Sequence, residues 1–343
     1  MFIEIFVIFI VKEKEYKFST NQIESQIPLL SQKGITEFSV HDEKLASDKN
    51  SLLKLMKLAA NKAPEVYFSF YIEASAIDRE IIAALQNLFC SIDIPLRPAF
   101  KNGKLLFDKK FYAGKANLLN EAGIVFGFHL TYAEIEGDNL KAFMDRLDFA
   151  VNQYPNHIDF PQTESGGKED LLNGDSAKVS GIFSAKDIRY ARDLSFACRT
   201  FYSSGRAVPW FLNLLRPLKI YPSRFFADFA EWQRCNNCDF KSGFLPEAEN
   251  HESIEKMQLL FLQEKYEEKN QHALFEIAAD IVRLNGAISR LEKEGDRAEI
   301  DLSYSADELL SPEVFNLEAF AENVCMEPSH LKLKIEGGEL VWN

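Results

Sequence analysis

The stretch GITEFSVHDE, residues 34–43, decides the predicted fold. It starts with a short apolar run that is typical of a buried strand, and it ends in three ionisable residues, His41, Asp42 and Glu43. One helical apolar pattern precedes this strand and another follows it. Strand, loop, helix and strand in that order form the βαβ unit of parallel sheets, which bind ligands at the carboxyl ends of their strands. We therefore expect the three ionisable residues to lie at a ligand-binding edge.

The same unit recurs along the first half of the chain. The intervals between strand starts are about 25 to 33 residues, which suits βαβ repeats. Strand-like runs begin near Ile35, Val66, Ser91, Ile124 and His157. An apolar run at residues 2–11 adds a first strand, so six βα units are expected. Six units are too few to close an eight-stranded barrel.

The prediction for residues 1–162 is therefore an α/β fold, an open partial (β/α)6 TIM-like barrel. Ligand sites of such folds form where the strands end. The predicted active face consists of residues 39–43, 71–73, 91–93, 128–129 and 159–162.

The second half of the chain has a different pattern. Residues 163–185 are mostly polar and lack an apolar period, which predicts a linker. Residues 186–343 are predicted to form a mostly helical C-terminal domain. A strand-like run at residues 299–304 is one candidate strand, and residues 331–341, with Gly337 and Gly338 in the middle, are predicted to form a small terminal β-hairpin.

Composition and charge limit the classes of function. The 343-residue chain carries a formal net charge of −13, which disfavours a nucleic-acid groove because phosphate binding needs clustered Lys and Arg. The apolar start is too short to span a bilayer and lacks the features of a signal peptide, so no membrane partner is expected. Five cysteines, an odd number, indicate a reducing compartment, and we expect a cytoplasmic protein.

Cys235 and Cys238 form a Cys-x-x-Cys pair. A tetrahedral zinc site needs two further ligands, which Cys198, Cys325 and His251 would supply only if the fold brought them close. One pair without a partner pair does not predict a site, so no metal ligands are assigned.

Short motifs follow one another on consecutive βα units. They are KFS at residues 17–19, GITEFSVHD at 34–42, SID at 91–93, VFGF at 125–128 and EGD at 136–138. In this order and spacing they resemble the radical SAM superfamily, in particular its cobalamin-associated branch, over roughly residues 1–165. Residues 201–211 look like the helical extension that some of these proteins carry.

The resemblance implies an enzyme that cleaves S-adenosylmethionine reductively at a four-iron cluster. In that family the loop after the first strand holds Cys-x-x-x-Cys-x-x-Cys, whose three thiolates bind three irons. Here no cysteine precedes Cys90, and Phe2, Phe6 and Phe9 stand at the same spacing. Either these phenylalanines replaced the ligands or, in a chain with 29 Phe, the spacing arose by chance. Phenylalanine cannot bind iron, so this chain does not support the 4Fe-4S cluster that the family implies.

The resemblance also implies a residual S-adenosylmethionine pocket of weak affinity, because the cluster iron that normally holds the cofactor is missing. It assigns His41, Asp42 and Glu43 to the amino group, Ser91 and Asp93 to the ribose, and Gly127 to the adenine. The alternative role for each is that of a polar residue at a strand end. For the single histidines His129 and His157 we expect core or surface roles rather than catalysis.

Two classes of function remain open. The first is a radical SAM enzyme that is active only if the natural chain begins upstream of Met1, or differs in its first ten residues, and carries the cluster loop. The second is a non-catalytic binding or partner protein that kept the barrel and lost the cluster. In either class the substrate is unknown.

Overall fold

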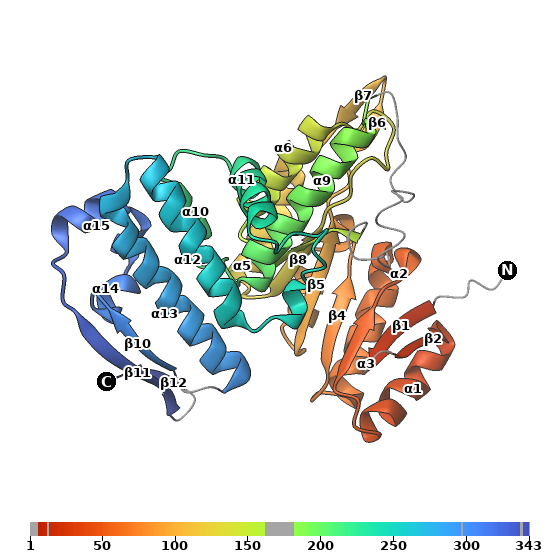
Figure 1. Cartoon of the computed structure of the whole chain (residues 1–343). Coiled ribbons are helices and arrows are strands. Elements are labelled where there is room, and N and C mark those ends of the chain that lie inside the picture. The colour runs from red at the N-terminus through yellow and green to blue at the C-terminus, as the bar shows by residue number, and fades with distance from the viewer. Residues whose placement is uncertain (1–5, 12–13, 162–181, 296–297, 337–338, 343) are drawn as a thin grey trace. The chain divides into compact units, whose positions relative to one another are not determined.

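The computed structural model describes residues 6–11, 14–161, 182–295, 298–336 and 339–342 of the chain. The chain divides into two compact units, one of residues 1–139 and 155–164 and the other of residues 140–154 and 165–343 (Figure 1). The predicted linker at residues 163–185 lies almost entirely outside the described residues, so its boundaries stay a prediction.

The first unit is organised around a parallel sheet of five strands in the order β3-β4-β5-β8-β9. Every neighbouring pair in this sheet is parallel, which confirms the predicted strand order and direction. The strands are β3 (Glu37–Val40), β4 (Tyr67–Tyr71), β5 (Cys90–Pro95), β8 (Val125–His129) and β9 (His157–Asp159). The helices of this unit are α1 (Thr20–Gln32), α2 (Glu43–Ser47), α3 (Lys49–Lys62), α4 (Arg79–Leu85) and α5 (Lys109–Glu121), with the 3-10 turn η1 (Ala74–Ala76).

The chain start differs from the prediction. The run at residues 2–11 is predicted to be the first of six parallel strands, followed directly by a helix. In the structure β1 (Phe6–Val11) pairs antiparallel with β2 (Lys14–Ser19). The run KEYKFS alternates charged with aromatic residues at Tyr16 and Phe18, a period-two pattern that indicates a strand and that the sequence analysis missed. The prediction of six βα units is therefore wrong for the first unit. In the described part of the chain the parallel sheet has five strands.

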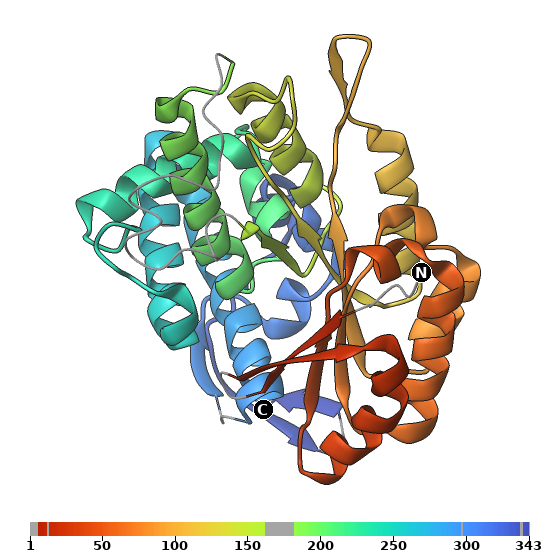
Figure 2. The ribbon, with the colours of Figure 1, turned by 90° about the vertical axis from the view of Figure 1, so that its right-hand side faces the viewer.

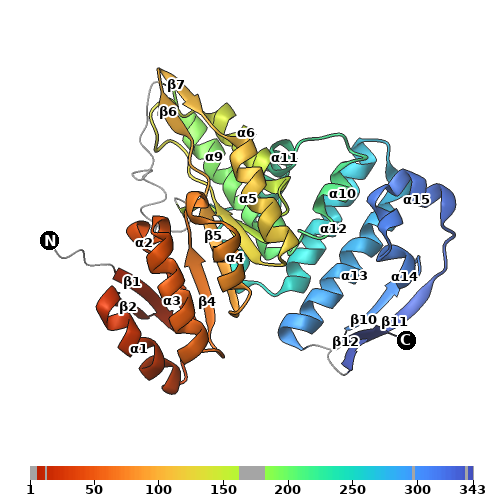
Figure 3. The ribbon, with the colours of Figure 1, turned by 180° about the vertical axis from the view of Figure 1, so that it is seen from behind.

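One face of the parallel sheet is entirely apolar. Alternate residues along a strand point to the same face, and here Phe38, Phe68, Ile92, Phe126 and Ile158 are fully buried. Helices α3, α4 and α5 lie side by side over this face (Figure 3). The opposite face carries the polar residues Ser69, Ser91, Asp93, His129 and His157, together with a few apolar ones such as Val125.

A small hairpin leaves the sheet after β5. Its strands are β6 (Ala99–Lys101) and β7 (Lys104–Leu106), and Figure 2 shows it projecting from the rest of the first unit. The two turn residues, Asn102 and Gly103, both have positive φ, 52° and 71°. This confirms the turn that the Asn-Gly pair predicted, because such turns require two residues in the left-handed region.

The second unit is mainly helical, as predicted. Its helices are α6 (Leu140–Val151), α9 (Ala185–Cys198), the π-helix η2 (Arg199–Ser204), α10 (Phe211–Leu215), α11 (Pro222–Cys235), α12 (His251–Glu268), α13 (Phe275–Glu294), α14 (Ala306–Leu309) and α15 (Leu317–Asn323). The 3-10 turns η3 (Pro246–Ala248), η4 (His272–Leu274) and η5 (Pro312–Phe315) connect them. Phe201 lies at the centre of an aromatic core, with its ring centroid 4.9 Å from that of Phe225 and 5.0 Å from that of Phe229. No helix in the described parts of the chain is both long enough and apolar enough to cross a bilayer.

The second unit also contains a three-stranded antiparallel sheet of β10 (Ala298–Leu302), β11 (Ser329–Glu336) and β12 (Glu339–Trp342). β11 and β12 form the predicted terminal hairpin. The fully buried carboxylate of Asp280 on α13 accepts hydrogen bonds from the backbone N–H groups of Ser303 at 2.6 Å and Tyr304 at 3.1 Å. This interaction fixes the end of β10 against α13.

A buried histidine, His251, is the first residue of α12 and links it to two other elements. The Nη1 of Arg290 donates to Nδ1 of His251 at 3.0 Å, and Nε2 of His251 donates to the carbonyl of Gly205 at 3.3 Å. These two contacts require the neutral ring. Burial, together with the charges of Arg206 and Arg290, lowers the pKa of His251 to about 4.

We expect acid to destabilise the second unit through His251. Its pKa in the folded chain lies below the usual value near 6.5, so the unfolded chain takes up the proton first and stability falls as the pH drops from about 6.5 toward 4. Between pH 7 and pH 5 the wild type should lose about 1 to 2 kcal/mol more unfolding free energy than His251→Gln, which does not titrate. Urea unfolding at both pH values measures this difference. An equal pH dependence in the two proteins would refute the assignment.

Candidate functional site

The polar face of the parallel sheet gathers ionisable residues at the carboxyl ends of three neighbouring strands. In the register of the sheet, Asp93 on β5 pairs with Gly127 on β8, which pairs with His157 on β9. Two residues later along these strands, His129 pairs with Asp159. His157 and Asp159 are two residues apart on β9, so their side chains lie on the same face. The parallel register therefore brings two imidazoles and two carboxylates together.

Each of these four side chains contacts at least one of the others. Nε2 of His157 lies 2.6 Å from Oδ1 of Asp93 and 3.3 Å from Oδ2 of Asp159. Nε2 of His129 lies 3.5 Å from the same Oδ2 of Asp159. The hydroxyl of Ser69 donates to Oδ2 of Asp93 at 3.1 Å. We call Asp93, His129, His157 and Asp159 the strand-end cluster.

Asp93 is ionised in this cluster. Burial alone would raise the pKa of Asp93, but the hydrogen bond with His157 and the charges of His157 and His129 outweigh it, so the pKa lies below its usual value. The carboxylate is thus held as an anion at neutral pH in a largely buried position. Such a group is available to bind a cation or a hydroxyl-bearing ligand.

An aromatic surface adjoins the cluster. The exposed ring of His41, at the end of β3, stacks on Tyr71 with centroids 4.2 Å apart and an interplanar angle of 19°. Tyr71 in turn meets His129 edge-on at 5.3 Å. Partial desolvation of the ring and the neighbouring His129 lower the pKa of His41, which favours its neutral form at pH 7.

Arg97 contacts this aromatic surface and two neighbouring carboxylates. Its guanidinium donates to the hydroxyl of Tyr71 at 2.9 Å and pairs with Glu43 at 3.2 Å and Glu73 at 3.4 Å. Burial disfavours the charged form of the Glu73 carboxyl and so raises its pKa. The arginine therefore orients Tyr71 and balances two carboxylates.

The three ionisable residues predicted to lie together after the strand that is now β3 separate in the structure. His41 lies against Tyr71, beside the cluster. Asp42 caps α2, where its carboxylate accepts from the backbone N–H groups of Lys44 at 2.9 Å and Leu45 at 2.7 Å. Glu43 points to Arg97. The ring of His41 lies 4.2 Å from that of Tyr71 and 6.2 Å from that of His129, centroid to centroid.

The residues predicted at the later strand ends also differ in position. Asp93 is at the centre of the cluster, whereas Ser91 lies two residues earlier on the same face and is 5% exposed. A Cβ on Gly127 would come within 2.1 Å of Nε2 of His157, so the imidazole occupies the space that a side chain would need. Gly127 is thus required by the packing of His157.

Sequence analysis placed His129 and Asp159 on the active face but gave no functional role to them or to His157. The available signal was positional: His129 ends one strand, and His157 and Asp159 alternate on the next. The structure adds that one ligand atom each of Asp93, His129 and Asp159 lie within 4.8 Å of one another. The search for such groups covered the described residues, and no group that it found lies outside this cluster.

The zinc hypothesis for the cysteine pair gains no support from this search, since no such group of described residues contains a cysteine. Cys238 is buried, which raises the pKa of its thiol to about 11, and Cys235 is exposed. Cys198, Cys325 and His251 are not gathered around the pair.

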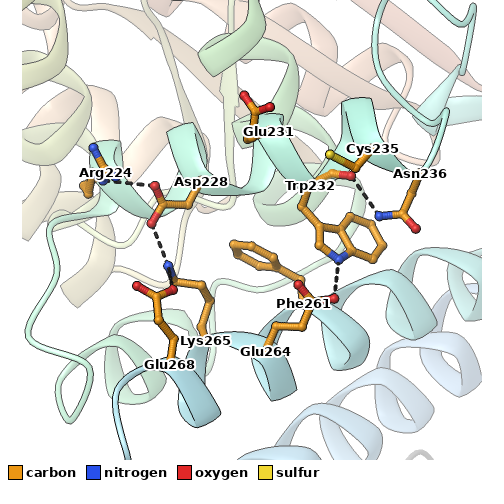
Figure 4. A pocket seen from close by; sticks show the side chains of 10 residues that line it. All are labelled: Arg224, Asp228, Glu231, Trp232, Cys235, Asn236, Phe261, Glu264, Lys265 and Glu268. Atoms are coloured by element: carbon orange, nitrogen blue, oxygen red, sulfur yellow. Dashed lines mark hydrogen bonds and ion pairs between the residues drawn. The ribbon is translucent and has the colours of Figure 1, made fainter.

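A surface groove between α11 and α12, of about 460 Å³, was considered as a second site (Figure 4). Its charged residues satisfy one another: Lys265 pairs with Asp228 at 2.7 Å, and Arg224 pairs with the same carboxylate at 2.9 Å. The indole of Trp232 donates to Glu264 at 2.9 Å. These contacts link the two helices, so we assign the groove a structural role.

No family model and no curated protein matches the sequence. Two solved structures of the radical S-adenosylmethionine methyltransferase TsrM from Kitasatospora setae are similar, one with tryptophan and an S-adenosylmethionine analogue bound and the other with cobalamin and a [4Fe-4S] cluster. Each is 14% identical, with a TM-score of 0.33, and the match covers 43% of this chain and 31% of that chain. At this level of similarity we base neither fold nor function on them.

The contact between Gly127 and His157 predicts the effect of a methyl group. Gly127→Ala should displace the imidazole and destabilise the chain by about 1 to 3 kcal/mol, as overpacking does. Gly114→Ala is the matched control, because that glycine is exposed in α5 with nothing within 4 Å of an added Cβ. The control should be stabilised by about 0.5 to 1 kcal/mol. Urea unfolding compares the two, and a neutral Gly127→Ala would contradict this packing.

Proposed function

We propose that this chain binds a small polar ligand at the carboxyl edge of its parallel sheet, without an iron–sulfur cluster. The observation that supports it is the contrast between the two faces of the sheet. Strands of parallel sheets are usually apolar on both faces, and here one face converges on Asp93, His129, His157 and Asp159. Ionisable groups are costly to desolvate, and core packing does not require them at this position.

We further propose that the five-stranded sheet is the parallel part of an open, partial barrel of the radical SAM type. The resemblance of the sequence motifs to that superfamily supports this. It makes S-adenosylmethionine the first ligand to test. In this proposal the carboxylate of Asp93 meets hydroxyl or ammonium groups of the ligand, and the exposed ring of His41 offers a stacking surface for a purine. Asp42, Glu43, Ser91 and Gly127 then support the site by the contacts described above.

The residues present do not fit a four-iron cluster. Such a cluster needs three cysteine thiolates around one centre. The chain has five cysteines, and among the described residues no close group of three ligands includes any of them. We therefore derive no reductive step for this chain, and the proposal is limited to binding.

The binding proposal is tested by calorimetry on protein treated with EDTA, so that metal ions do not contribute. S-adenosylmethionine should bind the wild type weakly but saturably, and Asp93→Ala should weaken binding at least tenfold. Asp145→Ala is the control, because this carboxylate lies on α6 and pairs only with the exposed Lys141 among the contacts described for it. Equal heats from wild type and Asp93→Ala, or no heat from either, would reject S-adenosylmethionine as the ligand of this site.

The cluster assignment has its own test. Anaerobic incubation of the chain with iron and sulfide should leave less than one four-iron cluster per chain, because the cysteines are scattered. Iron and sulfide analysis with visible absorption measures the yield. A stoichiometric cluster that broadens or shifts on addition of S-adenosylmethionine would overturn this assignment.

A further inference from the structure

We propose that Asp93, His129 and Asp159 bind one divalent transition-metal ion, with His157 as a positioning residue. This inference goes beyond ligand binding by the sheet edge and does not depend on it. One carboxylate oxygen from each aspartate and one ring nitrogen of His129 lie within 4.8 Å of one another. Ligands of a tetrahedral ion at about 2.1 Å are about 3.4 Å apart, so side-chain shifts on the order of 1 Å close the site.

Electrostatics favours a cation at this position. Two carboxylates from different strands approach the same imidazole, since Nε2 of His157 lies 2.6 Å from Asp93 and 3.3 Å from Asp159. Two partly buried anions this close repel each other unless a positive charge lies between them. A divalent ion would supply that charge and would bind both carboxylates directly.

The ligand types select the class of metal. Imidazole nitrogen is a typical ligand of zinc, iron, nickel and copper, whereas sites for magnesium and calcium consist of oxygen alone. A set of one imidazole and two carboxylates suits Zn²⁺, Fe²⁺, Mn²⁺ or Co²⁺. The side chains of Asp93 and His129 are each 15% exposed, so solvent reaches the cluster.

Three protein ligands are typical of catalytic rather than structural sites, because they leave a position for water or substrate. The remaining position would face the aromatic surface of His41 and Tyr71, since Tyr71 and His41 adjoin His129 at ring-centroid distances of 5.3 and 6.2 Å. A bound ion would supply Lewis acidity there. The residues of the chain would orient whatever ligand lies between the ion and these rings.

The surroundings of the site are arranged as in other metal sites, where neighbouring groups orient the ligands. Ser69 donates to Oδ2 of Asp93 while His157 contacts Oδ1, so both carboxylate oxygens are oriented. Gly127 provides the space that the ring of His157 fills. The positioning role of His157 therefore rests on backbone geometry as well as on its hydrogen bond.

The chain contains a matched comparison. On the antiparallel sheet of the second unit, Nδ1 of His330 lies 2.8 Å from Asp301 and Nε2 lies 3.6 Å from Glu299. This group also combines one imidazole with two carboxylates, but its side chains are 51% to 89% exposed, and Lys332 already pairs with Glu299 at 2.9 Å. It is an ordinary surface ion pair, so we expect no tight metal binding there.

The test uses the full chain, freed of any polyhistidine tag and of metal by EDTA. The chain is then titrated with Zn²⁺ in competition with a chromophoric chelator, and separately with Co²⁺, whose binding is followed by visible absorption. We expect one equivalent of metal per chain. His129→Ala should weaken binding about 100-fold or more, Asp159→Asn at least tenfold, and His157→Gln about tenfold. His330→Ala should leave the affinity within twofold of wild type.

A second measurement separates loss of binding from loss of folding. Because an ion that binds the folded chain raises its melting temperature, Zn²⁺ should stabilise the wild type and His330→Ala but not Asp159→Asn. Circular dichroism without metal should be the same for all three. The inference is overturned if the wild type binds less than one equivalent, or if His129→Ala and Asp159→Asn bind metal as tightly as the wild type.

Discussion

The alternation of side chains along parallel strands separates the sheet of the first unit into two faces with different tasks. Phe38, Phe68 and Phe126 point to the face that helices cover, and their complete burial stabilises the unit. The residues between them point the other way. Because the strands are parallel and in register, the polar residues at their carboxyl ends arrive at one edge. A slip of one residue in any strand would exchange the two faces.

The register of the strands places an ionised carboxylate, Asp93, in the strand-end cluster. Asp93 is largely buried, which by itself disfavours its charge, yet the contact with His157 keeps it ionised. Gly127 makes that contact possible by leaving room for the ring. A charged group retained at this cost, beside a second carboxylate and a second imidazole, is more readily explained by a ligand or an ion than by packing.

The second unit uses buried polar groups differently. Asp280 accepts two backbone hydrogen bonds and fixes β10, while His251 links Arg290 to the carbonyl of Gly205. Gln258 also donates to that carbonyl, at 2.9 Å, where the π-helix ends. Each of these groups connects elements that are distant in sequence. They stabilise one arrangement of the helices, and nothing in their geometry calls for a ligand.

The sequence by itself determined the order and direction of the five parallel strands, the helical second half, the Asn102–Gly103 turn and the terminal hairpin, because these follow from local periodicity and turn chemistry. It also located Asp93 and His41 at strand ends. Only the tertiary structure decided that Asp42 caps a helix, that Glu43 pairs with Arg97, and that residues 14–19 pair with the preceding strand. It alone brought His129, His157 and Asp159 to Asp93. Side-chain proximity across strands depends on the register of the strands and on the space left at Gly127. The spacing of residues along the chain predicts neither of them.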